Sequence, residues 1–457
     1  MSATTPDVAE AHHRLPTSLC IGFGIGSFGI SILLNTVTVF FPAMMTTVLG
    51  QSAAIAGLLL TVSKIYDAFA DIVIGTISDR TKHPKGRRRP FLLAGALVSA
   101  LSFVLMFAPP EMAEPALIGW MAAALIIYST GYSLFAVPYV AMAGEMTDGY
   151  NERTRLLSFR AFFISFGQIA ASAGTAALIA WAGGGRHGYA VMGVVGACAL
   201  ATTMILSYFG TARARIVEAA PRHHFSRREA IATLASNRPF LLLMGVKLAQ
   251  YCAIAIVSTT KLLFLLNVLR VGYAGLVTLT LVQNMVSAAA VPFWVWAARR
   301  VGKRPAYLAS TILLGTLYLS WFFTDATITT TELWVRGAVN GVAASGTSLL
   351  SIAMLPDVME YDHRRTGLRR EGIFSSVYTI LEKLGYALGA GIIGIFLAAA
   401  GYIPTLQGNL VDQPASAVMA LYAGSSLIPA GLIVISLVLM WLYRLDEDTL
   451  RQTEAIA

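Results

Sequence analysis

Charged side chains are scarce in this sequence. Asp, Glu, Lys and Arg make up 12% of its 457 residues, and hydrophobic residues make up 56%. Soluble domains usually carry about 25% charged residues. A chain this poor in charge could not cover a soluble surface, so it belongs in a membrane. The net charge of +9 is then better explained by basic loops on one side of a bilayer than by nucleic acid.

Motifs of catalytic chemistry are also missing. Cys20, Cys198 and Cys252 lack the spacing of a CxxC motif or a metal site, which favours buried packing residues. No phosphate-binding loop, nucleophile triad or metal-ligand set is found. We therefore expect neither an enzyme nor an ATP-driven pump, and no cofactor.

Twelve apolar segments are each near or above the roughly 20 residues that a membrane-spanning helix needs. An all-α integral membrane protein with twelve transmembrane helices is therefore expected. The predicted spans are 17–48, 54–78, 91–109, 116–147, 156–183, 188–210, 238–268, 273–298, 305–324, 331–359, 371–400 and 414–443.

The basic residues are distributed unequally between the loops. Of the 33 Lys and Arg, 25 fall in the termini and in loops on the side of the N-terminus, and two fall in the opposite loops. Because loops rich in Lys and Arg stay in the cytoplasm, we expect both termini there, in a cell (inner) membrane protein.

A weak repeat divides the chain in two. Gly86-Arg-Arg-Arg-Pro90 follows the second span and Gly302-Lys-Arg-Pro305 follows the eighth, while Pro138 and Pro356 recur late in the fourth and tenth. Two six-helix halves around a midplane site are the major facilitator architecture. The expected parts are a tail at 1–16, a half at 17–210, a linker with a short helix at 211–237, a half at 238–443 and a tail at 444–457.

The second span contains charges that an apolar helix would not carry without a reason. Lys64, Asp67 and Asp71 lie three and four residues apart, so they share one helical face. An ionised carboxylate inside a membrane costs several kcal/mol unless it is paired, hydrated or protonated. Two carboxylates one turn apart favour reversible Na⁺ or H⁺ binding. The alternative is an ion-pair cluster with Lys64 that only holds helices together.

Two further charges lie within predicted spans. Lys383 needs an anion, and Asp67 or Asp71 in the other half is the natural partner; otherwise its ammonium extends to the membrane surface. Arg160 in the fifth span either binds substrate through its planar guanidinium or pairs with a helix end.

Charged residues in or next to the loops rich in Lys and Arg are candidate gate residues. They can form salt bridges that break when a cytoplasmic gate opens, or they are only a solvated loop face. The candidates are Arg153, Arg155, Asp357 and Glu360.

Five segments together resemble the glycoside–pentoside–hexuronide:cation symporter family of the major facilitator superfamily. The resemblance covers about residues 17–400. It rests on Lys64-x-x-Asp67-Ala-x-x-Asp71-x-x-x-Gly75, Gly86–Pro90, Val137-Pro138-Tyr139, Glu152–Arg155 with Arg160, and Leu381–Gly385.

This resemblance implies roles for individual residues. Asp67 and Asp71 would be the cation-site carboxylates, which would bind the metal ion if Na⁺ is used. Ser133 would be a hydroxyl ligand, Lys383 would be coupled to the site, and Arg160 would border the substrate cavity.

The chain departs from the sugar carriers of that family at four positions. Ser31 and Ala136 stand where those carriers have acidic residues, and Val140 stands where they have a tryptophan that stacks on the sugar. Ala70, before Asp71, stands where an amide is expected. The sequence therefore leaves both the sugar and the choice between Na⁺ and H⁺ open.

The function expected is cation-coupled symport of a sugar, glycoside or oligosaccharide by alternating access, with Lys64 and Lys383 in coupling and Arg160, Tyr132 and Tyr139 in substrate binding. A carrier of a lysolipid or another organic solute is the alternative, and a non-transporting receptor or scaffold is the alternative from another class. The expected partners are a small molecule and the lipid bilayer, without nucleic acid or an obligate protein partner.

Overall fold

Long helices make up most of the protein. The computed structural model describes residues 15–84, 86–147, 150–214, 234, 236–366, 370–409 and 411–445. Within these ranges twelve spans are long and apolar enough to cross a membrane, which confirms the expected fold. The helices are α1 (Thr17–Thr47), α2 (Ala53–Arg80), α3 (Arg89–Phe107), α4 (Glu114–Glu145), α5 (Tyr150–Ile169), η1 (Ala170–Gly174), α6 (Thr175–Trp181), α7 (Gly185–Gly210), α9 (Arg238–Asn267), α10 (Gly272–Val301), α11 (Lys303–Ser320), η2 (Trp321–Phe323), α12 (Thr330–Ala353), α13 (Leu355–Thr366), α14 (Glu371–Ala399), α15 (Ala415–Tyr422), η3 (Ala423–Leu427) and α16 (Ile428–Leu442).

Local sequence signals explain where several helices begin. Ser52 caps α2 by accepting a hydrogen bond from the Ile55 amide, and Asn237 caps α9 in the same way. Thr329 and Glu332 form a reciprocal capping box at the start of α12. The short helix predicted in the linker lies outside the described residues.

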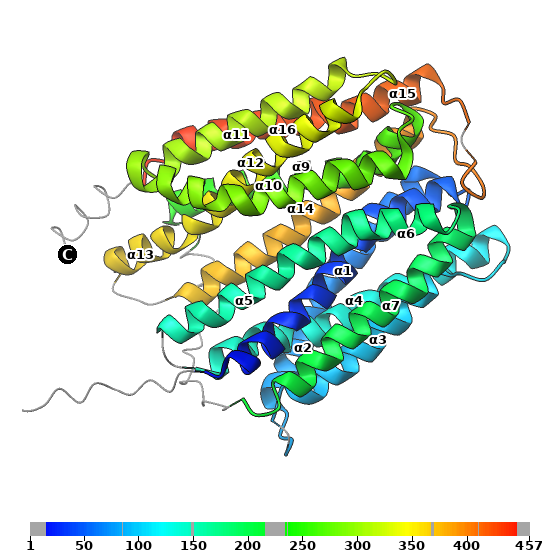
Figure 1. Cartoon of the computed structure of the whole chain (residues 1–457). Coiled ribbons are helices and arrows are strands. Elements are labelled where there is room, and N and C mark those ends of the chain that lie inside the picture. The colour runs from blue at the N-terminus through cyan, green and yellow to red at the C-terminus, as the bar shows by residue number, and fades with distance from the viewer. Residues whose placement is uncertain are drawn as a thin grey trace, which may run out of the picture.

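The helices form two groups that lie side by side (Figure 1). In the first, α1 packs against α5 and α7, and α3 packs against α4 and α7. In the second, α9 packs against α14 and α16, and α12 packs against α10 and α11. The groups meet chiefly where α2 packs against α14, with further contacts of α1 with α9 and of α5 and α6 with α10.

One end of the bundle, where α1 begins and α2 ends, is called the basic end here after Arg87, Arg88 and Arg89. At the opposite end the two groups are joined. The loop after α14 donates backbone hydrogen bonds from Thr405 to the Thr46 carbonyl at 2.8 Å and from Gln407 to the Val48 carbonyl at 3.0 Å. These contacts close that end between the halves.

Glycine lets α2 and α14 approach each other closely near the closed end. A Cβ atom on Gly57 would lie 2.5 Å from the Ala390 carbonyl oxygen, which cannot move without the α14 backbone. One turn on, the Thr61 hydroxyl donates to the Ala387 carbonyl at 2.8 Å. The crossing therefore places the next turns of α2 directly against α14.

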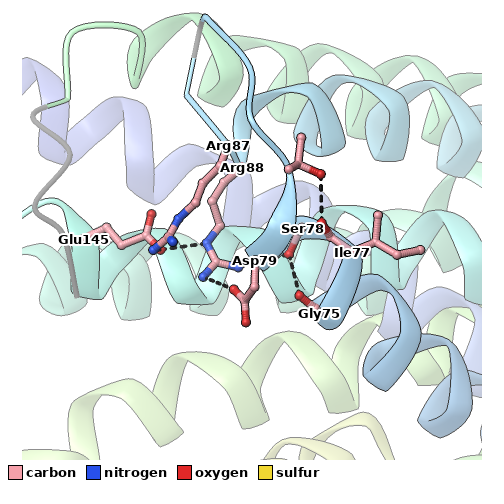
Figure 2. A network of polar contacts seen from close by, with 8 residues as sticks. Gly75, Ile77, Ser78, Asp79, Arg87, Arg88 and Glu145 are labelled. Carbon is pink, nitrogen blue, oxygen red and sulfur yellow. Dashed lines mark hydrogen bonds and ion pairs between the residues drawn. The ribbon is translucent and has the colours of Figure 1, made fainter. Parts of the chain in front are cut away.

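An ion-pair network fixes the other end of α2 (Figure 2). The Arg88 guanidinium contacts Asp79 at 2.6 Å, Glu145 at 2.8 Å and the Ser78 hydroxyl at 3.0 Å. Arg87 donates to the same Glu145 carboxylate at 2.6 Å. Glu145 ends α4, so the loop after α2 is tied to the helix that packs beside α2.

Candidate functional site

The charges of α2 and α14 meet between the two halves. The Lys383 ammonium lies 2.8 Å from Asp67 Oδ2 and 2.5 Å from Asp71 Oδ2. The same nitrogen donates to the Asp67 carbonyl oxygen at 3.3 Å. Asp67 is 2% exposed, and both carboxylates sit on the face of α2 that the residue spacing predicted.

Ser133 on α4 completes this cluster. Its hydroxyl lies 3.0 Å from Asp67 Oδ1 and 2.6 Å from Asp71 Oδ1. Each carboxylate thus has one oxygen against the ammonium and one against the hydroxyl. The two carboxylates and the hydroxyl bring five side-chain oxygens into one cluster, and oxygen ligands are what a hard cation such as Na⁺ prefers.

The cluster has an excess negative charge. With its groups ionised, Asp67, Asp71 and Lys383 together carry a net charge of −1. Unbalanced charge in a low-dielectric interior is costly, and a bound monovalent cation or proton removes it. The arrangement can therefore take up one cation, which either joins Lys383 or displaces it.

A cavity of about 610 Å³ borders the cluster. It begins at mid-membrane on α1 and α2 and extends along α4 and α14 toward the basic end, to Ala141 and Ser376. The contacts that join the halves lie at the other end. Its lining residues are Leu34, Asn35, Thr38, Val39, Lys64, Asp67, Asp71, Tyr132, Ala136, Val137, Val140, Ala141, Ile254, Ser258, Ser376, Thr379, Glu382, Lys383 and Tyr386.

Lys64 lines the cavity but lies outside the ion-pair cluster. Its residue is 9% exposed, and its ammonium lies 5.7 Å from the centre of the Tyr128 ring. Within the described part of the chain it has no hydrogen-bond or ion-pair partner. The ion pairs of Asp67 and Asp71 are therefore made with Lys383 and not with Lys64 in this structure.

Of the two tyrosines predicted to bind substrate, one lines the cavity and the other does not. Tyr132 lines the cavity, with its ring centre 5.9 Å from the Lys383 ammonium. Tyr139 does not: it is fully buried, and its hydroxyl bonds to Ser27 at 2.7 Å and to the Phe23 carbonyl at 2.6 Å. The prediction of substrate contact for Tyr139 is corrected here, because α1 covers that side of α4.

Arg160 also lies away from the lining residues of the cavity. Its buried Nε atom has no hydrogen-bond partner among the described residues. Substrate binding by Arg160 stays a prediction, and this cavity does not include it.

The predicted gate residues that are described pair within their own halves. Arg155 contacts Glu152 at 3.2 Å and Thr17 at 2.7 Å. Asp357 pairs with Lys303 at 2.7 Å, and Glu360 pairs with Arg364 one turn away. The Arg153 side chain lies outside the described residues. None of the three described pairs joins the halves.

Sequence reasoning missed several parts of the site. Glu382 was not among the predicted site residues, but it lines the cavity together with Lys383. Asn35 and Thr38 in the first span were polar signals that could have been used. Glu145 is the partner of Arg87 and Arg88. The sequence signal for it was an acidic residue at the end of the fourth span, on the same side of the membrane as the loop that contains Arg87 and Arg88.

Comparisons with known proteins show the family of this chain. Residues 22–447 match the model of a family described as MFS/sugar transport protein. The isoprimeverose transporter of Lactiplantibacillus pentosus is 26% identical over 97% of this chain and 92% of its own. A glucuronide carrier protein homolog of Escherichia coli (strain K12) is 27% identical over 96% of this chain and 95% of its own.

Solved structures share the fold. A bacterial homolog of the human lysosomal transporter Spinster, in an inward-facing and unoccupied conformation, matches with a TM-score of 0.68 and 15% identity over 96% of this chain and 97% of its own. A bacterial homologue of the peptide transporters PepT1 and PepT2 matches with a TM-score of 0.69 and 12% identity over 95% of this chain and 99% of its own.

Fold and site together define a multi-pass membrane transporter of the major facilitator type, which is not an enzyme. Within that superfamily, the chain belongs to the MFS/sugar transport protein family, which includes the glycoside–pentoside–hexuronide:cation symporters.

Proposed function

We propose that the protein is a symporter that couples a Na⁺ or H⁺ gradient to import of a sugar or glycoside by alternating access. The observation that carries this proposal is the Asp67–Lys383–Asp71 cluster, with its net charge of −1, beside a cavity between the halves. No other cofactor and no obligate protein partner is part of the proposal.

The cluster supplies a physical route for coupling. Asp67 and Asp71 belong to the first half, and Lys383 belongs to the second, so the ion pairs hold the halves together at mid-membrane. A cation that binds the carboxylates and Ser133 weakens their attraction for the ammonium. Cation occupancy then biases the relative position of α2 and α14, as a ligand biases a two-state equilibrium.

The cavity fits a sugar in size and in chemistry. Its volume of about 610 Å³ falls within the range of about 300–1,000 Å³ typical of small-molecule sites. Asn35, Thr38, Tyr132, Ser376 and Thr379 offer amide and hydroxyl groups to sugar hydroxyls. Relatives named for isoprimeverose and glucuronide favour a sugar over a lysolipid, and transport over a receptor role.

The proposed orientation places the basic end and both termini in the cytoplasm of a cell (inner) membrane protein. Lys and Arg accumulate at that end, as the positive-inside rule requires. The central cavity would then face the cytoplasm in this structure, with the outer end closed by the loop after α14.

Counterflow in proteoliposomes tests the proposal. Vesicles loaded with a panel of sugars and glycosides should exchange at least one of them, and accumulation should follow an imposed Na⁺ or pH gradient. The double change Asp67→Asn and Asp71→Asn should abolish gradient-driven accumulation. Unchanged accumulation in that variant would show that the cation does not act through this cluster.

A further inference from the structure

The second half contains a small cavity that is separate from the central cavity. It has a volume of about 20 Å³, and its lining residues come from α9, α10, α11, η2, α12 and η3. Its walls are mainly apolar, but Lys261, Tyr318, Asn340 and Ser425 bring polar groups to it. It shares no lining residue with the central cavity, so the proposed cation cluster does not explain its charge.

Lys261 places a positive charge at this cavity. An ammonium has three N–H donors, and the described residues offer this one a single contact, the Gln283 Oε1 atom at 3.5 Å. The same oxygen also accepts a hydrogen bond from the Asn340 amide at 3.2 Å. No carboxylate among the described residues lies within ion-pair distance of Lys261. Because an ammonium inside a membrane protein is costly without an anion, a negative charge in the cavity would stabilise the protein.

The π-helical turn η3 brings a second unpaired polar group to the cavity. Thr260, the residue before Lys261, donates a hydrogen bond to the Gly424 carbonyl at 3.3 Å. A Cβ atom on Gly424 would lie 2.8 Å from the Thr260 side chain, so glycine allows this approach. The next residue, Ser425, is 6% exposed and lines the cavity, yet its hydroxyl has no hydrogen-bond partner among the described residues. Such turns within α-helices are frequent at functional sites.

A second cation lies close to the cavity. The Arg336 guanidinium on α12 is 4.6 Å from the centre of the Trp321 ring, and Trp321 lines the cavity. Arg336 donates to the Ser320 hydroxyl at 2.6 Å. Glu332, one turn earlier on α12, caps the helix by accepting a hydrogen bond from the Thr329 amide at 2.9 Å. Two cations and one carboxylate leave an excess positive charge in this region, which favours an anion.

We propose that this cavity binds one monatomic anion, such as chloride, between the Lys261 ammonium and the Ser425 hydroxyl. The size decides the class of ligand, because a volume of about 20 Å³ holds about one water-sized particle and excludes a sugar or a phosphate group. The anion neutralises Lys261 and accepts the hydrogen bond that Ser425 does not otherwise make. It acts within the second half, apart from the cation cluster, so the inference does not depend on which substrate is carried.

Thermal unfolding of the purified full chain tests the site. Chloride replaces gluconate in steps while Na⁺ concentration and ionic strength stay constant, so that occupancy of the cation cluster does not change. We expect the melting temperature of the wild type to rise with chloride and to reach a plateau, and bromide should act in the same way. Gluconate is too large for the cavity and serves as the inert anion. A melting temperature that is independent of both halides would overturn the proposal.

Two variants and a matched control locate the effect. Lys261→Met should raise the chloride concentration at the midpoint of the titration by about 30-fold, because it removes a charge-assisted contact. Ser425→Ala should raise it by about tenfold. Lys247→Met is the control, because Lys247 is another lysine of α9 but already donates to Gln250 at 2.9 Å and to Ser351 at 3.0 Å. Its loss should leave the chloride midpoint unchanged.

Anomalous diffraction from crystals grown in bromide gives a direct readout. A peak between Lys261 and Ser425 is expected in the wild type and should be absent in Lys261→Met. Equal chloride midpoints in the wild type and Lys261→Met would mean that the anion binds elsewhere and would overturn the proposal. If Lys261→Met does not fold, an unchanged midpoint in Ser425→Ala has the same consequence. None of these outcomes requires sugar transport, so they are independent of the proposed symport function.

Discussion

Replacing Asp71 by asparagine removes one unit of charge from the cation cluster at nearly constant shape. The remaining Asp67 and Lys383 would form a neutral pair, 2.8 Å apart in the present structure. Such a pair no longer needs an external cation. We therefore expect Asp71→Asn to lose cation binding while it still folds and binds substrate.

The size of the effect follows from the geometry. A cation held between the carboxylates lies about 4 Å from the lost charge, which corresponds to about 4 kcal/mol at an effective dielectric constant of about 20. The Asp71 side chain retains 22% of its exposed area, so water screens part of this interaction. A loss of about 3 kcal/mol remains, equivalent to an affinity about 100-fold lower.

Thermal stability provides the assay. Wild-type protein should gain stability on titration with NaCl at constant ionic strength, or on lowering the pH if the ion is a proton, and Asp71→Asn should not. Asp412→Asn removes the same charge at an exposed pair with Arg270 and should leave the titration unchanged. If Asp71→Asn has the same midpoint as the wild type in the NaCl or pH titration, and still accumulates substrate against its gradient, Asp71 is not a cation ligand.

Three further predictions concern neighbouring features. Ser133→Ala should weaken cation binding by about tenfold without uncoupling transport, because one hydroxyl contact is worth about 1–1.5 kcal/mol; no change in the NaCl or pH titration would exclude it as a ligand. Gly57→Ala should lower the free energy of unfolding by about 1–3 kcal/mol, because its Cβ would meet the α14 backbone; an unchanged melting temperature would contradict that packing. Glu145→Gln should lower the free energy of unfolding by about 3–5 kcal/mol, because it leaves buried Arg88 short of an anion. A melting temperature equal to that of the wild type would mean that Asp79 alone compensates the charge of Arg88.

The span boundaries show where sequence patterns stop being informative. Bilayer thickness fixes the length of an apolar helix, so most predicted ends fall close to those observed. The fifth and tenth spans differ more: α5 begins at Tyr150, and α13 continues to Thr366. Both extensions are polar helical turns beyond the apolar segment, and hydropathy does not detect them because their backbone hydrogen bonds need no apolar side chains.

The candidate site was partly accessible from the sequence. The cost of intramembrane charge made Asp67 and Asp71 natural partners for Lys383, and the structure places the three in contact. Tyr139, seven residues after Tyr132, shares its helical face by count, yet Ser27 and the Phe23 carbonyl cover it. Which neighbour covers a face depends on helix rotation, and no local pattern encodes that rotation.

What the sequence by itself determined is the number of helices, their expected orientation and the presence of a titratable cluster. These follow from the high cost of placing polar backbone and charge in hydrocarbon, which acts on each segment separately. Only the tertiary structure decided which charges neutralise one another. It joined Lys383 to Asp67 and Asp71 across the two halves and left Lys64 open to the cavity, because electrostatic balance depends on distances between helices far apart in the chain.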